Sequence, residues 1–154
     1  MGVDEFNAYT LTARLELDLT STSVYEKLKT SGLQSYAGNI SGMSDFMLYT
    51  LSYLKAARVN HPSTYQNIKN SPLFLAHINS LWESAENTLN IVYNFTLSKG
   101  GVYSVNSEVI AEIYSPELIS ELDVLGISIF NLTIGVIPIF PKVYLLKTLE
   151  RNNQ

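Results

Sequence analysis

Polar and apolar positions alternate through residues 88–113, on both sides of the sequence Ser98-Lys99-Gly100-Gly101. Every second position of the first half is apolar, and most of the positions between are polar: Leu89, Ile91, Tyr93, Phe95 and Leu97 are the apolar ones. A two-residue period puts apolar side chains on one face of a strand and polar ones on the other. The Gly-Gly pair supplies the positive φ angles of a tight turn. The stretch therefore predicts a β-hairpin.

A second alternating run extends from Tyr9 to Thr20, with apolar residues at Leu11, Ala13, Leu15, Leu17 and Leu19. Leu and Ala favour helices, but a helix would distribute these side chains around its circumference. The alternation therefore predicts a strand over 9–20.

Helix signals separate these runs. A helix is expected over 44–58, and its few polar positions predict that it is mostly buried. Ser71-Pro72 and Ser115-Pro116 each combine an N-cap residue with Pro at the first helical position, and Gly126 would end the second of these helices. Residues 32–42, with three Gly among Ser and Asn, read as a loop.

Residues 124–141 carry no charge, and their length is at the threshold for a membrane span. β-Branched residues, two Gly, and the prolines at 138 and 141 favour a buried central strand instead. Lys142 bounds the run as an interfacial anchor would, so a membrane-associated segment is the alternative. Residues 150–154 are expected to form a loose polar tail.

These elements predict a single globular domain over 1–154 of the α+β class. The expected architecture is an antiparallel sheet of three to five strands with helices packed on one face, and an all-α bundle is the alternative. A chain of 154 residues with 46% hydrophobic and 16% charged residues can bury a substantial core.

Composition excludes several kinds of chemistry. The chain has no Cys, which removes disulfides, Cys-ligated zinc and thiol nucleophiles. The net charge is −4, and no basic stripe favours nucleic acid. Residues 70–141 contain seven Asp or Glu and one Lys, an acidic region suited to a basic protein partner, although a solubilising surface has the same composition. No signal peptide opens the chain, which favours the cytoplasm, and a virion also fits.

Candidate catalytic and metal-binding residues are sparse. His61 and His77 are the only histidines, and neither has a carboxylate or a second His three or four residues further on. Glu108 and Glu112 are too far apart along a strand to act as a pair, although they would be neighbours in a helix. No phosphate-binding loop occurs. The sequence therefore predicts no catalytic residue, no metal and no cofactor.

The outward faces of the two alternating runs are rich in Thr, Asn and Ser and poor in Lys, whereas edge strands that avoid pairing usually carry Lys or Pro. Association through sheet edges or through the polar face is therefore expected, and it predicts a homo-oligomer. The candidate interaction surface comprises Thr10, Thr12, Arg14, Glu16, Asn90, Asn94, Thr96, Glu108 and Glu112.

The sequence thus favours a non-enzymatic interaction or assembly protein, and a viral or accessory protein fits the lack of motifs. One alternative is a module that binds a small apolar molecule among Tyr and Phe side chains. Another is an enzyme whose Asp, Glu and Tyr residues meet only in space.

Overall fold

The computed structural model describes residues 3–19, 22–23, 36–99, 107–127 and 129. Nearly all of these residues are helical, and none of them is in a strand. The helices are α1 (Val3–Leu19), α3 (Tyr36–Asn60), α4 (Pro62–Lys69), α5 (Pro72–Lys99), α6 (Ser107–Ile113) and α7 (Pro116–Leu125). In its described part the protein is an all-helical bundle. The predicted α+β class with an antiparallel sheet is wrong there, and the alternative fold class is the one observed.

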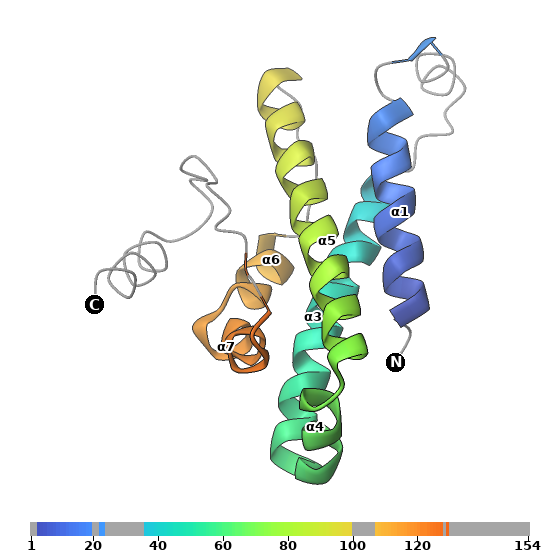
Figure 1. The fold of residues 1–154 in the computed structure, drawn as a ribbon. Helices are drawn as coiled ribbons and strands as arrows, with labels where there is room; N and C mark the ends of the chain where they lie inside the picture. Colours follow the sequence, from blue (N-terminus) through green and yellow to red (C-terminus); the bar gives the residue numbers. More distant parts are fainter. Residues whose placement is uncertain (1–2, 20–21, 24–35, 100–106, 128, 130–154) are drawn as a thin grey trace, which may run out of the picture.

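Helix α3 forms the axis of this bundle (Figure 1). It contacts each of the other five helices, and α1 also packs against α5. Helices α6 and α7 lie on one side of α3, whereas α1 lies on the other, and α4 closes the end where α3 stops (Figure 1). The packing therefore places α1 and α7 on opposite flanks of one central helix.

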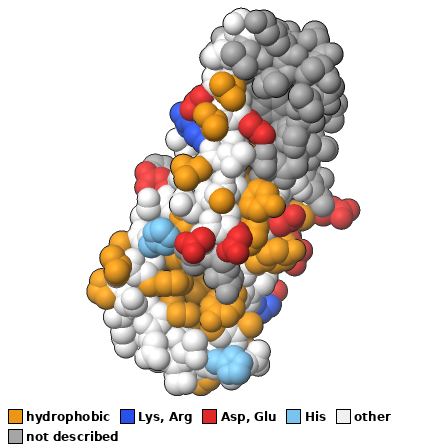
Figure 2. Space-filling model, turned by 90° about the vertical axis from the view of Figure 1, so that its right-hand side faces the viewer, with side chains coloured by type: hydrophobic (Ala, Val, Ile, Leu, Met, Phe, Trp, Pro, Cys, Tyr) orange, Lys and Arg blue, Asp and Glu red, His pale blue; other side chains and the backbone are white. Residues whose placement is uncertain are grey.

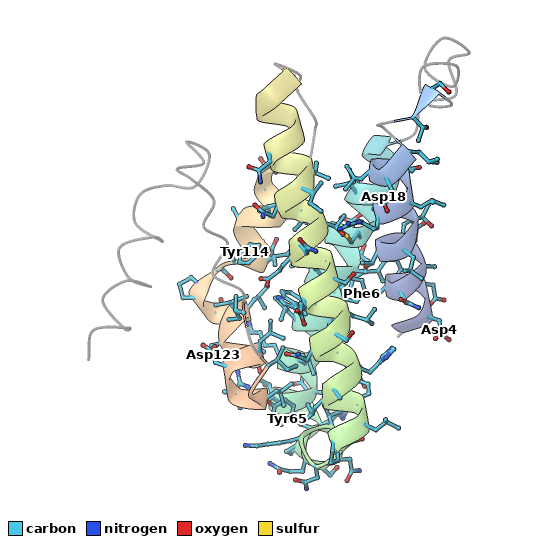
Figure 3. All side chains as sticks on the ribbon, turned by 45° about the horizontal axis from the view of Figure 1, so that its top comes forward. Asp4, Phe6, Asp18, Tyr65, Tyr114 and Asp123 are labelled. Carbon is cyan, nitrogen blue, oxygen red and sulfur yellow. The ribbon has the colours of Figure 1, made fainter. Side chains whose placement is uncertain are left out.

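The core is a single cluster to which every described helix contributes. Its central helix supplies one continuous row of buried side chains: Ile40, Met43, Met47, Leu51, Leu54 and Ala57. Trp82 of α5 is fully buried against this cluster, and Phe6 lies between α1 and α5 (Figure 3). Burial of these apolar side chains supplies the main driving force for folding.

The predicted hairpin over 88–113 is wrong. Residues 72–99 form the single helix α5, and residues 107–113 belong to α6, while 100–106 are outside the described residues. The buried side chains of α5 recur at helical spacing: Ile78, Leu81, Trp82, Ala85, Leu89 and Val92. The buried stripe of α5 therefore begins before residue 88 and continues beyond it. The alternating pattern covered only the second half of this helix.

The predicted strand over 9–20 is also wrong, because residues 3–19 form α1. Its buried row is Phe6, Thr10, Ala13 and Leu17, the spacing of one helix face. Leu11 and Leu15 are each 59% exposed, so α1 carries apolar residues on its outer side as well. Apolar residues on two sides of a helix imitated the two-residue period of a strand.

The Ser-Pro signals were read correctly. Helix α5 begins at Pro72, and the Ser71 side chain accepts a hydrogen bond from the Phe74 backbone N–H at 3.4 Å. Ser115 caps α7 in the same way, and Gly126 ends that helix with φ of +71°. A positive φ is a conformation that Gly adopts without strain.

Helix α3 extends beyond both ends of the predicted helix over 44–58. It begins at Tyr36, so the loop expected over 32–42 is wrong for residues 36–42. The charge-free run over 124–141 starts inside α7, and its residues 130–141 are outside the described residues. The tail over 150–154 is outside them too.

Candidate interaction surface

Four residues of the interaction surface predicted from the sequence lie on α1. Thr10 is 1% exposed, and its hydroxyl donates to the Phe6 carbonyl at 2.8 Å. Thr12 is exposed, and Arg14 forms an ion pair with Asp18 at 3.3 Å. Glu16 is partly buried. A helix turns these side chains in different directions, so they do not form the single face that a strand would give them.

The remaining predicted residues lie on α5 and α6. Asn94 donates a side-chain hydrogen bond to Asn90 at 3.3 Å, one helical turn away. Thr96 lies within α5, and its side chain is outside the described part. Glu108 and Glu112 are exposed on consecutive turns of α6. The predicted surface is thus distributed over three helices, because the sheet that was expected to unite it is not observed.

Three aromatic rings from α1 and α3 form a connected, partly exposed row instead, with Phe46 in the middle packed against the core. The ring centroids of Tyr9 and Phe46 are 5.3 Å apart with their planes tilted by 31°. Phe46 also meets Tyr49 edge-on at 6.0 Å. Tyr9 is 37% exposed and Tyr49 is 56% exposed, while Tyr53, one helical turn further along α3, is 41% exposed.

Gly42 allows Tyr9 to pack this closely on α3. A Cβ atom at position 42 would lie 2.5 Å from Tyr9 Cε1 and 2.6 Å from Cδ1. These distances are shorter than any van der Waals contact, so every other residue type would displace the ring. The glycine costs helix stability relative to Ala, and in return the ring lies directly on the α3 backbone.

Carboxylates stand one helical turn before two of these rings. Glu5 precedes Tyr9 on α1, and Asp45 precedes Tyr49 on α3. Neither carboxylate forms a hydrogen bond or an ion pair within the part of the chain that is described. Figure 2 shows Asp and Glu side chains beside hydrophobic ones on the side of the molecule where α1 lies. We call this surface the tyrosine–acid face: Glu5, Tyr9, Asp45, Tyr49 and Tyr53.

Acidic residues on the opposite flank are used within the protein. Arg58 of α3 binds Glu121 of α7 in a bidentate pair, with Nη2 to Oε1 at 2.6 Å and Nε to Oε2 at 3.0 Å. Glu121 is 1% exposed. One helical turn from this pair, Lys55 of α3 donates a hydrogen bond to Glu117 of α7 at 2.5 Å, and this hydrogen bond lowers the pKa of the Glu117 carboxyl. Both acids attach α7 to α3; Glu121 is enclosed, whereas Glu117 is exposed and already holds Lys55.

A second polar contact joins α5 to the turn that follows α6. The Tyr114 hydroxyl donates to Glu86 Oε1 at 3.1 Å, and Glu86 is 1% exposed (Figure 3). Burial raises the pKa of Tyr114 well above its ordinary value, and the nearby Glu86 carboxylate raises it further. Glu86 is buried and Tyr114 is partly buried against the core, so their hydrogen bond stabilises the bundle.

The described residues hold no group of three His, Asp or Glu placed to bind a metal ion, and both histidines are exposed. Within the described residues, no helix combines the length and the apolar character that crossing a membrane requires. The tyrosine–acid face is therefore the strongest candidate site in this part of the chain.

Sequence reasoning missed this face although a signal for it was present. Asp45, Tyr49 and Tyr53 recur every fourth residue, and so do Glu5 and Tyr9. That spacing lines residues along one side of a helix. The helix over 44–58 was expected to be mostly buried, and residues 9–20 were read as a strand, so neither row was recognised.

Comparison with known proteins gives no relative: no family model, no curated protein and no solved structure matches this chain.

Proposed function

We propose that this protein is a non-enzymatic interaction protein whose tyrosine–acid face binds a basic segment of a protein partner. The observation that carries the proposal is a set of exposed Tyr side chains, at 37%, 56% and 41% for Tyr9, Tyr49 and Tyr53, beside carboxylates that have no partner among the described residues. Tyr is enriched at protein interfaces because its ring is large and rigid and its hydroxyl remains polar.

Charge supports a basic partner. The chain carries fourteen Asp or Glu and ten Lys or Arg, a net charge of −4, and Lys55 and Arg58 already pair with Glu117 and Glu121. An acidic surface attracts a basic segment over a distance and repels acidic competitors. Glu5 and Asp45 can bind such a segment without first breaking an ion pair to any residue that the structure describes.

The test is an NMR titration of the isotope-labelled protein with an amidated basic peptide, Gly-Arg-Gly-Lys-Gly-Arg-Gly-Lys-Gly. We expect saturable shifts of backbone signals in α1 and α3. The double variant Tyr49→Ser and Tyr53→Ser should weaken binding by roughly tenfold, because interface Tyr side chains carry much of the binding energy. The substitutions leave the net charge unchanged, and Ser has a helix propensity similar to that of Tyr.

Leu73→Ser is the matched control. Leu73 is 84% exposed on α5 and belongs to no part of the tyrosine–acid face, so its replacement should leave the affinity unchanged. If the peptide shifts the signals of all acidic surfaces equally, or if the double variant binds as well as the parent, the proposal is wrong.

The homo-oligomer expected from the sequence stays a prediction. The sheet edge that was to carry it is not observed in the described residues, and we propose the outer side of α1, where Leu11 and Leu15 are exposed, as the contact. Sedimentation equilibrium of the parent and of Leu11→Ser with Leu15→Ser tests it. A monomer for both at tens of micromolar contradicts self-association. The apolar-ligand and enzyme alternatives and the cytoplasmic location stay predictions as well.

A further inference from the structure

We infer that the tyrosine–acid face selects arginine over lysine in its partner and holds two arginines of one extended segment. This inference rests on the proposed function, and it adds the identity of the contacting side chain and the number of positions for it.

The face repeats one arrangement twice. Glu5 lies one helical turn from Tyr9, and Asp45 lies one helical turn from Tyr49. Each pair thus combines a carboxylate with a phenol ring at the spacing of neighbouring side chains. A cation between the two members of a pair contacts both.

Arginine fits such a pair better than lysine does. A guanidinium is planar, so it stacks on a phenol ring and still directs edge N–H groups at a carboxylate. An ammonium is compact and strongly hydrated, and it loses more hydration when it lies against a ring. Glu5 is exposed and Asp45 is partly exposed, and neither carboxylate has a partner in the described residues, so both can accept hydrogen bonds from a guanidinium.

The two pairs are close enough for one segment. Phe46 lies between their rings, with its centroid 5.3 Å from that of Tyr9 and 6.0 Å from that of Tyr49. Side chains two residues apart in an extended strand point to the same side, about 7 Å apart. The long side chains of an Arg-x-Arg sequence can therefore reach both pairs from one extended segment.

The rings are also held before binding. Contact with Phe46 restrains Tyr9 and Tyr49, and the close fit of Tyr9 on Gly42 restrains it further. A surface that is already ordered loses less side-chain entropy when a partner binds. Positions fixed in this way can discriminate between a flat and a compact cation.

The experiment compares three amidated peptides of equal length and charge in the same NMR titration. They are Gly-Gly-Arg-Gly-Arg-Gly-Gly, the same peptide with both arginines replaced by lysine, and the same peptide with both arginines dimethylated. We expect the arginine peptide to bind roughly fivefold more tightly than the lysine peptide. Dimethylation keeps the charge and blocks bidentate hydrogen bonding, so it should reduce affinity to about the lysine level.

Variants locate the effect. Asp45→Asn should reduce the preference for arginine to within about twofold. Glu83→Gln, which removes one exposed charge from α5, should preserve it. Equal affinity for arginine and lysine overturns this inference and leaves the proposed function standing. If none of the three peptides binds, the proposed function fails together with the inference.

Discussion

Replacing Gly42 with Ala tests the contact that holds Tyr9 on α3. In an exposed helix Ala is more favourable than Gly by about 0.5–1 kcal/mol. At position 42 the new methyl group would lie 2.5 Å from Tyr9 Cε1, so the ring must move away from Phe46. An aromatic pair contributes about 0.5–1.5 kcal/mol beyond its buried area. The two effects oppose each other, so we expect Gly42→Ala alone to change the free energy of unfolding by less than about 1 kcal/mol.

The same substitution should behave differently once Tyr9 is truncated. In a Tyr9→Ala background no ring obstructs the methyl group, and Gly42→Ala should stabilise the protein by the full helix preference, about 0.5–1 kcal/mol. The difference between the two backgrounds is the coupling energy of the pair, which we expect to be about 0.5–1.5 kcal/mol.

Urea unfolding of the four proteins measures this cycle. The midpoint is followed by Trp82 fluorescence and by circular dichroism, and coincidence of the two curves supports two-state analysis. With a slope of about 1–3 kcal/mol per molar urea, a coupling of 1 kcal/mol shifts the midpoint by about 0.3–1 M. If Gly42→Ala stabilises the parent and the Tyr9→Ala variant equally, the close packing of Tyr9 on α3 is refuted. The affinity for the arginine peptide should also fall in Gly42→Ala, because the displaced ring no longer lies beside Phe46.

Three further outcomes follow from the bundle. Far-UV circular dichroism of the whole chain should be dominated by α-helix, and a spectrum dominated by β-structure would contradict the fold. Tyr114→Phe removes the donor to Glu86 and should lower stability at neutral pH by about 1–3 kcal/mol. The pKa of Tyr114 is raised in the folded state, so the stability that its hydroxyl contributes is present below the ordinary pKa near 10 and is lost as pH rises beyond it. The difference in free energy of unfolding between parent and variant, measured in urea, should therefore narrow at alkaline pH. A difference that widens would contradict this. Lys55 lowers the pKa of Glu117, so that pair stabilises the fold above the ordinary carboxyl pKa and stops doing so as pH falls below it. The thermal midpoints of the parent and of Glu117→Gln should therefore differ at neutral pH and converge in acid, and a constant difference would contradict this assignment.

Local signals in the sequence predicted helix ends better than they predicted helices. Ser115 and Gly126 act through groups within a few residues of themselves, a capping hydroxyl and a positive φ, so tertiary structure does not alter their meaning. Pro72 marks a helix start for the same local reason.

The two longest wrongly predicted segments, 9–20 and 88–113, were misread because tertiary packing decides which of their apolar residues are buried. Leu11 and Leu15 are each 59% exposed, so these apolar residues do not mark the buried face of α1. Together with the buried residues they give the two-residue period that predicted a strand. In α5 the row of buried side chains starts at Ile78. The apolar residues over 89–97, taken without the first half of the helix, recur at every second position and so predicted a strand. The tyrosine–acid face was missed as a consequence, because its residues come from two helices that only the packing of α1 on α3 brings together.

The position of α3 also has a consequence for how the protein unfolds. Every other described helix packs against α3, so detaching any one of them would expose part of the apolar surface of α3 to water. Such an arrangement links the separate contacts into one cooperative transition, and it argues against a stable half-bundle from either end of the chain. A fragment that ends before residue 60 should therefore have no fixed tertiary structure.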